Sequence, residues 1–259
     1  MTKDMDMRAV ILAGGKGTRL APYTTVFPKP LMPIDDVPML EVVVRQLRHH
    51  GIRRLTFAVE HLAELLMVYF GDGSKYGVEI EYSREEQPLG TAGPLKLIPA
   101  LTGTFLLMNG DVLTDLPYAA LVDAHKQSDA VATIAMHKRE VKVDLGVIQL
   151  GDDNRVTGYL EKPSQHYRVS MGVYVFEPKA LSFIGEGERL DFPDLILRLI
   201  KAGEVVKGYP YDGYWMDIGR HEDYEQAVED FRRNRERLLP EGPNAKAQRG
   251  KGAEGTGQA

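Results

Sequence analysis

Apolar and polar residues follow two kinds of pattern along this chain. The first is a short apolar run: residues 8–13 (RAVILA) are followed at once by two glycines. Such a run, with β-branched residues and a glycine stop, predicts a strand buried on both faces. The second is a helical spacing: residues 38–50 carry leucine and valine three and four positions apart and end before Gly51. This spacing predicts a helix with one buried face. Gly51 predicts where the helix ends, because glycine commonly follows the last turn of a helix.

The two patterns alternate to about residue 238. Short apolar runs predict further strands at 55–59, 78–82, 105–108, 130–136, 146–150, 156–161 and 171–177. Helical spacing predicts further helices at 63–70, 93–101, 118–127, 191–202 and 221–238. Strands that alternate with helices of these lengths form βαβ units, which build a mostly parallel sheet. We therefore predict an α/β fold.

We expect a single domain over residues 8–239. Residues 1–7 contain two aspartates and one lysine and lack the basic and apolar regions of a signal peptide, so we expect a disordered leader. Residues 240–259 contain five glycines and no large apolar side chain, so we expect a disordered tail. No hexapeptide repeat follows the α/β part, so we expect no β-helix domain.

Composition narrows the classes of function. The proportions of hydrophobic (43%) and charged (27%) residues are typical of a soluble globular protein. The absence of cysteine excludes a disulfide scaffold, a zinc–thiolate site and a cysteine nucleophile. A net charge of −5 gives no overall basic field for nucleic acid, and no apolar stretch is long enough for a membrane span. We expect a cytoplasmic protein that binds neither nucleic acid nor membrane.

The loop after the first predicted strand favours phosphate binding. Residues 12–20 read LAGGKGTRL, with three glycines in four positions. Glycines let the backbone turn sharply and approach a ligand, and the exposed N–H groups suit phosphate oxygens. The spacing does not fit a P-loop. A dinucleotide fingerprint would need a third glycine where Leu20 stands, so that alternative is weakened but stays open, as does a glycine turn without a ligand.

Two cations follow the glycines. Arg19 comes two residues after Gly17, and Lys29 stands between Pro28 and Pro30. The two prolines restrict the backbone on either side of the lysine, which suits a fixed positive charge. Together with the glycines, these cations favour a site for phosphate groups.

Residues 12–20, followed by Pro22 and by PKP at 28–30, resemble the signature of the sugar-1-phosphate nucleotidyltransferases, the NDP-sugar pyrophosphorylases. The resemblance extends over roughly residues 7–232. It implies a three-layer, Rossmann-like nucleotidyltransferase fold with a mostly parallel, mixed central sheet. It also implies transfer of a nucleoside monophosphate from a nucleoside triphosphate to a sugar 1-phosphate, with Mg²⁺ as cofactor. These two substrates are the implied partners, and the resemblance allows a homodimer.

The resemblance assigns roles to individual residues. The implied nucleotide-binding residues are Leu12, Ala13, Gly14, Gly15, Gly17, Thr18, Gln87, Gly90 and Thr91. The implied sugar-phosphate residues are Gly146, Glu161, Lys162, Ser170 and Gly172. The implied catalytic cations are Arg19, Lys29 and Lys162. The implied Mg²⁺ ligands are Asp111 and Asp217.

General chemistry supports the two aspartates. Asp111 follows a predicted buried strand, and open α/β sheets bind their ligands outside the carboxyl ends of such strands. Two carboxylates are enough for Mg²⁺, which keeps water and substrate phosphates as its other ligands. Asp217 lies 106 residues further on, so spacing alone says nothing of its position.

The base and the sugar stay open. Residues 88–93 (PLGTAG) and 170–172 (SMG) are more similar to the guanylyltransferase branch, which uses mannose- or heptose-type sugar phosphates. Many relatives have Asn-Ala-Gly at the second segment, so no sugar is carried over. Thymidylyl or uridylyl transfer to glucose 1-phosphate is the alternative. A non-catalytic nucleotide-sugar sensor is another, although such a sensor would be expected to lack a metal aspartate or the phosphate lysine.

Overall fold

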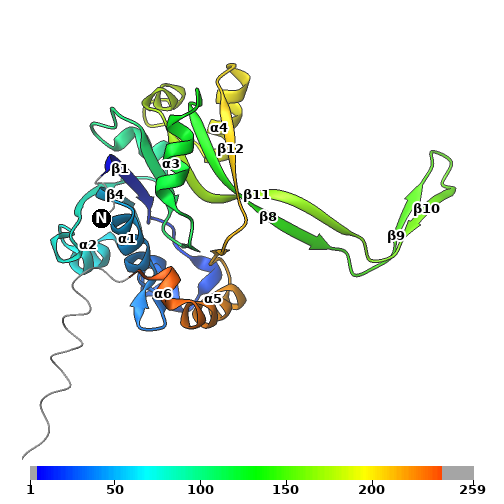
Figure 1. Ribbon diagram of the computed structural model, residues 1–259, viewed down its shortest axis with the longest axis horizontal. Coiled ribbons are helices and arrows are strands. Elements are labelled where there is room, and N and C mark those ends of the chain that lie inside the picture. Colours follow the sequence, from blue (N-terminus) through cyan, green and yellow to red (C-terminus); the bar gives the residue numbers. More distant parts are fainter. Residues whose placement is uncertain (1–4, 241–259) are drawn as a thin grey trace, which may run out of the picture.

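A mixed sheet of seven strands forms the centre of the computed structural model, which describes residues 5–240 (Figure 1). In spatial order its strands are β12 (Val206–Tyr211), β8 (Ala132–Lys142), β11 (Ser164–Phe176), β6 (Phe105–Asn109), β1 (Met5–Leu12), β4 (Ile52–Val59) and β5 (Glu79–Arg84). Strand β11 is antiparallel to both of its neighbours, and the other pairs are parallel. The predicted mostly parallel, mixed sheet is therefore confirmed.

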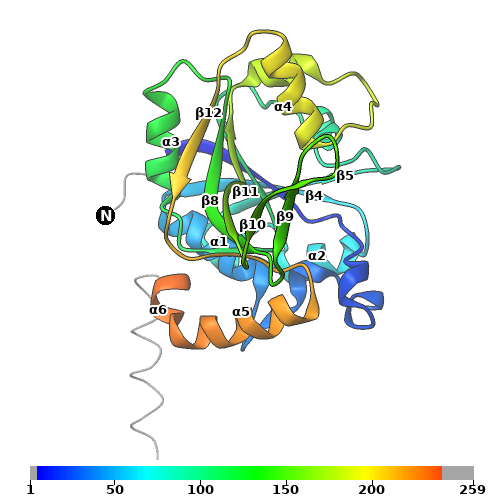
Figure 2. The same cartoon turned by 90° about the vertical axis from the view of Figure 1, so that its right-hand side faces the viewer.

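Both faces of the sheet are covered, which gives three layers. Successive residues of β1 alternate between two apolar clusters: Ala9 and Ile11 join one, and Val10 joins the other. The first cluster includes the buried faces of α1 (Met39–His49), α2 (Ala63–Phe70) and α3 (Tyr118–Lys126). The second includes that of α4 (Phe192–Lys201). Figure 2 shows α4 on the opposite side of the sheet from α1. Burial of every second residue on each face explains why the strands read as continuous apolar runs.

The last two helices that the structure describes pack beside α1 in a third apolar cluster. The predicted helix over 221–238 is two helices, α5 (His221–Arg233) and α6 (Arg235–Leu238). A buried side chain connects this end to the rest: Gln46 donates 2.7 Å hydrogen bonds to the carbonyl oxygens of Thr114 and Leu238. Within residues 5–240, no helix combines the length and the apolar character that crossing a bilayer requires.

Two sequence predictions are wrong. Residues 5–7 do not belong to a disordered leader but begin β1, because Met5 pairs with Ile52 of β4 and Met7 is buried in the core. Residues 93–101 do not form an α-helix: only Gly93–Leu97 is helical, and it is a 3-10 helix. The N–H groups of Ala92 and Gly93 both donate to the Leu190 carbonyl, so the start of this segment is held by a contact with a distant part of the chain. The rest of the leader and the tail from 241 lie outside the described residues.

Several short strands were not predicted. They are β2 (Pro33–Ile34), β3 (Val37–Pro38), β7 (Val112–Thr114) and β13 (Trp215–Asp217). The antiparallel pair β7–β13 joins segments about 100 residues apart, with Asp217 opposite Val112. Edge strand β12 was also missed, since VKGYPY has neither a long apolar run nor a clean alternation.

Strands β8 and β11 extend far beyond the sheet as a two-stranded arm. We define the arm as residues 138–170; it ends in a second pair, β9 (Val147–Leu150) and β10 (Val156–Leu160). The pairing of β8 with β12 stops at His137, so the outer part of β8 pairs only with β11. Figure 1 shows the arm projecting away from the body. The sequence predicted only the inner ends of β8 and β11, which are the parts buried in the sheet. The strands predicted at 146–150 and 156–161 correspond to β9 and β10.

Candidate active site

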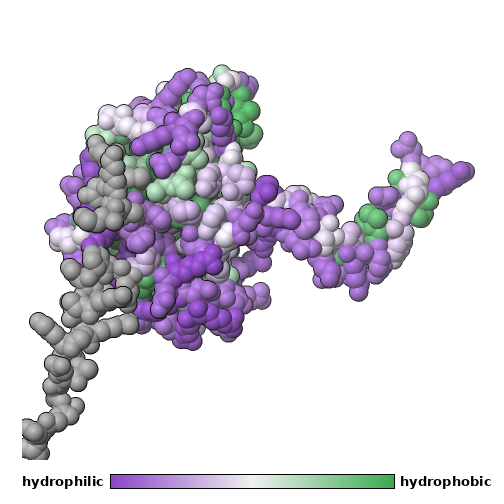
Figure 3. All heavy atoms as spheres, in the orientation of Figure 1, coloured by the Kyte–Doolittle hydropathy of each residue, from purple (hydrophilic) through white to green (hydrophobic). Residues whose placement is uncertain are grey.

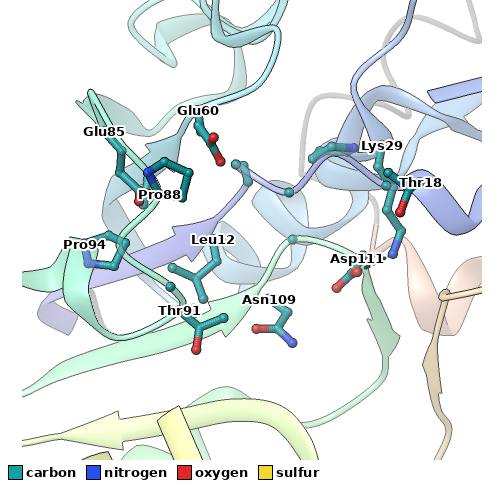
Figure 4. Close-up of a pocket in the computed structure, with 18 of the residues that line it drawn as sticks. Leu12, Thr18, Lys29, Glu60, Glu85, Pro88, Thr91, Pro94, Asn109 and Asp111 are labelled. Atoms are coloured by element: carbon teal, nitrogen blue, oxygen red, sulfur yellow. Dashed lines mark hydrogen bonds and ion pairs between the residues drawn. The ribbon is translucent and has the colours of Figure 1, made fainter. Parts of the chain in front are cut away.

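A cavity of about 410 Å³ lies at the carboxyl ends of three central strands (Figure 4). Leu12 and Ala13 line it from β1, Ala58 and Glu60 from β4, and residues 109–111 from β6. This is the edge at which open α/β sheets bind ligands. The other lining residues are Gly14, Gly15, Gly17, Thr18, Arg19, Lys29, Pro30, Glu85, Pro88, Gly90, Thr91, Pro94 and Arg189.

The glycine loop is held in place by its neighbours. The Ala13 N–H donates to the carbonyl of Ala58 at 2.8 Å. Gly17 has a φ of +60°, and a Cβ there would lie 2.9 Å from the side chain of Thr24. Thr24 in turn donates to the Gly17 carbonyl at 2.7 Å. A Cβ on Gly15 would meet nothing within 4 Å, so this position faces open space. The loop therefore presents its backbone to the cavity in a fixed shape.

A buried lysine and the carboxylate of Asp111 lie at one end of the cavity. Lys29 is 8% exposed, and its ammonium forms an ion pair with the carboxylate of Asp111. The N–H of Ile218 donates to the backbone carbonyl of Asp111 at 3.2 Å, which places Asp217 beside it. Burial and the negative charge of Asp111 raise the pKa of Asp217, while Lys29 and Arg19 oppose this rise. The β7–β13 pairing thus joins two carboxylates that are 106 residues apart in the sequence.

This pair of carboxylates fits a magnesium ion. No group of three or more metal-binding side chains occurs within residues 5–240, so a candidate metal has to rely on few protein ligands. Mg²⁺ suits such a donor set because it retains several waters and takes substrate phosphates as ligands. The raised pKa of Asp217 reflects unfavourable negative charge, which a divalent cation would relieve. Asp111 and Asp217 are the residues that would hold it.

The turn at residues 87–94 packs on the segment before α4. Thr91 donates its N–H to the Asp191 carboxylate at 2.9 Å, and the Ala92 N–H donates to the Leu190 carbonyl at 2.8 Å. Gly90 has a φ of +78°, and a Cβ there would lie 2.6 Å from the Leu190 oxygen. Gly90 and Thr91 line the cavity, whereas Gln87 is exposed and does not line it.

We expect Gly90→Ala to lower the free energy of unfolding by about 1–3 kcal/mol, because alanine is strained at positive φ and meets a backbone oxygen. Denaturant unfolding checks this. The matched control is Gly203→Ala, which has the same φ of +78° but open space around its Cβ. The control isolates the backbone strain, so the Gly90 variant should lose more stability. Equal losses would show that the contact with Leu190 has no effect.

The predicted sugar-side residues fall into two groups. Ser170 and Gly172 lie where the arm meets the body, and a Cβ on Gly172 would lie 2.7 Å from the Asn109 amide nitrogen at the cavity. Gly146, Glu161 and Lys162 lie on the arm, outside the cavity lining. The structure thus brings together the glycine loop, the cations at 19 and 29 and both aspartates. It does not bring the three arm residues to the same cavity within one chain.

Sequence reasoning missed several lining residues. Glu60 directly follows the predicted strand 55–59, so its place at a strand end was a usable signal. Glu85 follows β5 in the same way; burial raises its pKa, and it accepts the Leu89 N–H at 2.9 Å. Asn109 and Arg189 also line the cavity. Nothing in the local sequence marks Arg189, which comes from a segment 80 residues beyond Asn109.

The sheet, its two covered faces and the cavity at its carboxyl edge define a Rossmann-like α/β protein. Residues 8–234 match the family described as nucleotidyl transferase, and this chain belongs to that family.

Proteins that are similar in sequence or structure support the same family. The chain is 36% identical over 242 residues to a UTP–glucose-1-phosphate uridylyltransferase of Synechocystis, covering 86% of this chain and 62% of that protein. It is 35% identical over 230 residues to a mannose-1-phosphate guanyltransferase of Yarrowia lipolytica, covering 84% and 62%. The crystal structure of HddC from Yersinia pseudotuberculosis complexed with GMP-PN is 26% identical, with a TM-score of 0.66, covering 87% and 99%. The chain thus spans about three-fifths of the length of the first two.

Proposed function

We propose that this chain transfers a nucleoside monophosphate from a nucleoside triphosphate to a sugar 1-phosphate. One observation carries the proposal: the glycine loop, the Lys29–Asp111 ion pair and the 87–94 turn line one cavity. In the proposal, the loop binds phosphates, the ion pair forms the charged centre and the turn contacts the nucleotide. Membership of the nucleotidyl transferase family supports the same reaction.

In the proposed reaction, an oxygen of the sugar phosphate attacks the α-phosphorus of the triphosphate in line. The bond between the α-phosphorus and the bridging oxygen breaks, and pyrophosphate leaves with that oxygen. A phosphate nucleophile is already ionised near neutral pH, so no general base is needed. The difficulty is bringing anions together, and positioning and electrostatic stabilisation therefore provide the rate.

The residues of this chain divide that work. Backbone N–H groups of residues 13–18 would bind the triphosphate oxygens, as glycine loops before short helices do. Arg19 and Lys29 would balance the charge of these phosphates, and Lys162 that of the incoming sugar phosphate. When bound to Asp111 and Asp217, Mg²⁺ would supply further positive charge to the phosphates. Glu161 would accept hydrogen bonds from sugar hydroxyls.

For the substrates we propose GTP with a mannose- or heptose-type sugar 1-phosphate. Residues 88–93 and 170–172 support this choice, as do relatives named mannose-1-phosphate guanyltransferase. The structure of HddC complexed with GMP-PN also supports a guanine nucleotide. Uridylyl or thymidylyl transfer to glucose 1-phosphate is the second candidate, favoured by the similarity to the Synechocystis uridylyltransferase.

A substrate panel tests the proposal. ATP, GTP, CTP, UTP and dTTP would each be paired with mannose, heptose and glucose 1-phosphates, and pyrophosphate release would be measured with Mg²⁺. We expect GTP with mannose or heptose 1-phosphate to give the highest kcat/KM. Highest turnover with UTP or dTTP and glucose 1-phosphate would select the second candidate. Nucleotide binding without pyrophosphate release from any pair would contradict catalysis and indicate a sensor.

A further inference from the structure

The arm exposes an unusual concentration of apolar side chains. Within the described residues, half of the exposed large apolar side chains lie between positions 141 and 167: Val141, Val143, Leu145, Ile148, Leu150, Val156, Tyr159, Leu160 and Tyr167. Figure 3 shows apolar residues on the visible face of the outer arm. A two-stranded ribbon has no core of its own and is marginally stable in water. Apolar side chains gathered in this way mark a surface that packs against a partner.

The root of the arm is fixed to the body. The indole N–H of Trp215 donates to the Met171 carbonyl at 3.0 Å, and the His137 ring nitrogen lies 3.0 Å from the Gly213 carbonyl. These contacts hold both strands at the point where they leave the sheet. The direction of the arm is therefore set by the body.

Lys162 is far from the cavity of its own chain. The β8–β11 pairing runs without a register shift from Ser170 to Ser164, opposite Met136 to Lys142. Eight residues separate Lys162 from Ser170, a distance of roughly 25 Å along an extended strand. The root of the arm lies against Asn109, which lines the cavity. While this pairing is intact, Lys162 cannot enter the cavity of its own chain.

The body carries an apolar surface beside the cavity. Tyr23, Val26 and Phe27 are 58%, 75% and 44% exposed. They lie in the segment that connects Arg19 to Lys29, and both of these cations line the cavity. An apolar ribbon could pack on this surface and reach the phosphate site at the same time.

We propose that two copies of this chain exchange arms, so that each arm packs on the partner's 23–27 surface and delivers Lys162 to the partner's cavity. The proposal rests on the proposed function, which assigns Lys162 to the phosphate of the sugar 1-phosphate. Exchange of identical elements gives a two-fold symmetric dimer in which the same contact is made twice. It also explains how one chain can contain every expected site residue and still leave its cavity without Lys162.

A mixed dimer tests the exchange. Asp111→Asn and Lys162→Ala chains, carrying different affinity tags, would be co-expressed and the mixed dimer purified on both tags. With exchanged arms, one cavity has both lesions and the other has none, so turnover should be about half that of the wild-type dimer. Each variant alone should be slower by on the order of 10² or more. If each arm serves its own cavity, both cavities of the mixed dimer carry a lesion. Turnover as low as that of the parent variants would overturn the proposal.

The oligomeric state provides a readout independent of turnover. Light scattering should show a wild-type dimer, and Leu145→Glu in the arm should shift it to the monomer and lower turnover. The matched control is Leu197→Glu on α4, where leucine is 62% exposed; it should stay dimeric and active. A monomeric wild-type enzyme with full turnover would overturn the exchange. Failure of the proposed function would look different: no substrate pair would release pyrophosphate, whereas the arm-dependent dimer would persist.

Discussion

Asp111→Asn should lower kcat/KM for pyrophosphate release by on the order of 10²–10³, the usual cost of removing one preorganised charge from such a site. Asparagine keeps the shape of the side chain but removes the negative charge that pairs with Lys29 and faces Asp217. The concentration of Mg²⁺ needed for half-maximal turnover should rise as well, since one of two proposed ligands is lost. Steady-state kinetics over a Mg²⁺ titration measures both effects.

The control for this variant is Asp129→Asn. Asp129 forms a surface ion pair with Lys207 at 2.8 Å, outside the cavity, and exposed pairs of this kind contribute little to stability. Its turnover and Mg²⁺ dependence should match those of the wild type. Near-normal pyrophosphate release from the Asp111→Asn variant would contradict the assignment of this aspartate.

Lys29→Met should reduce kcat/KM by a similar factor, on the order of 10²–10³. Methionine retains an unbranched apolar stem, so the main change is the loss of a cation beside two carboxylates. The Asp111 side chain is 25% exposed, so removal of the cation leaves a partly buried carboxylate without its counter-charge. We expect a loss of about 1–3 kcal/mol in the free energy of unfolding, measured by denaturant titration.

A double-mutant cycle separates the ion pair from other effects of these changes. The Lys29→Met/Asp111→Asn double variant leaves neither charge unpaired, so it should lose less stability than the sum of the single variants, by about 0.5–3 kcal/mol. The same cycle on Lys207 and Asp129 should give a smaller coupling, about 0.2–1 kcal/mol. Additive losses at Lys29 and Asp111 would mean that their ion pair does not stabilise the fold.

Local pattern was enough to predict elements whose burial repeats regularly along the chain. The 8–13 run and the 38–50 spacing correspond to most of β1 and to α1, because both have faces that pack in the core. Local pattern does not predict the structure where a distant contact sets the conformation. Residues 5–7 become a strand only because β4 lies beside them, and 93–97 form a 3-10 turn packed on Leu190.

The arm is a second region where local sequence pattern does not predict the whole structure. The outer parts of β8 and β11 lack buried faces, so no periodicity in burial marks them, and only the inner ends of these two strands were predicted. Short pairs such as β7–β13 were missed because three residues carry too little pattern. Yet this last pairing places Asp217 next to Asp111, which no spacing could reveal.

The sequence by itself determined the α/β class and predicted phosphate binding at residues 12–20. These follow from local rules, namely the periodicity of apolar residues and the freedom of glycine, whereas the roles of single site residues came from the family resemblance. Only the tertiary structure decided which of those residues meet. It joined Lys29 and Asp111 at one end of a cavity, placed Asp217 next to Asp111 and carried Lys162 away on the arm. Such proximity depends on pairing between segments about 100 residues apart, and that pairing is a property of the whole fold.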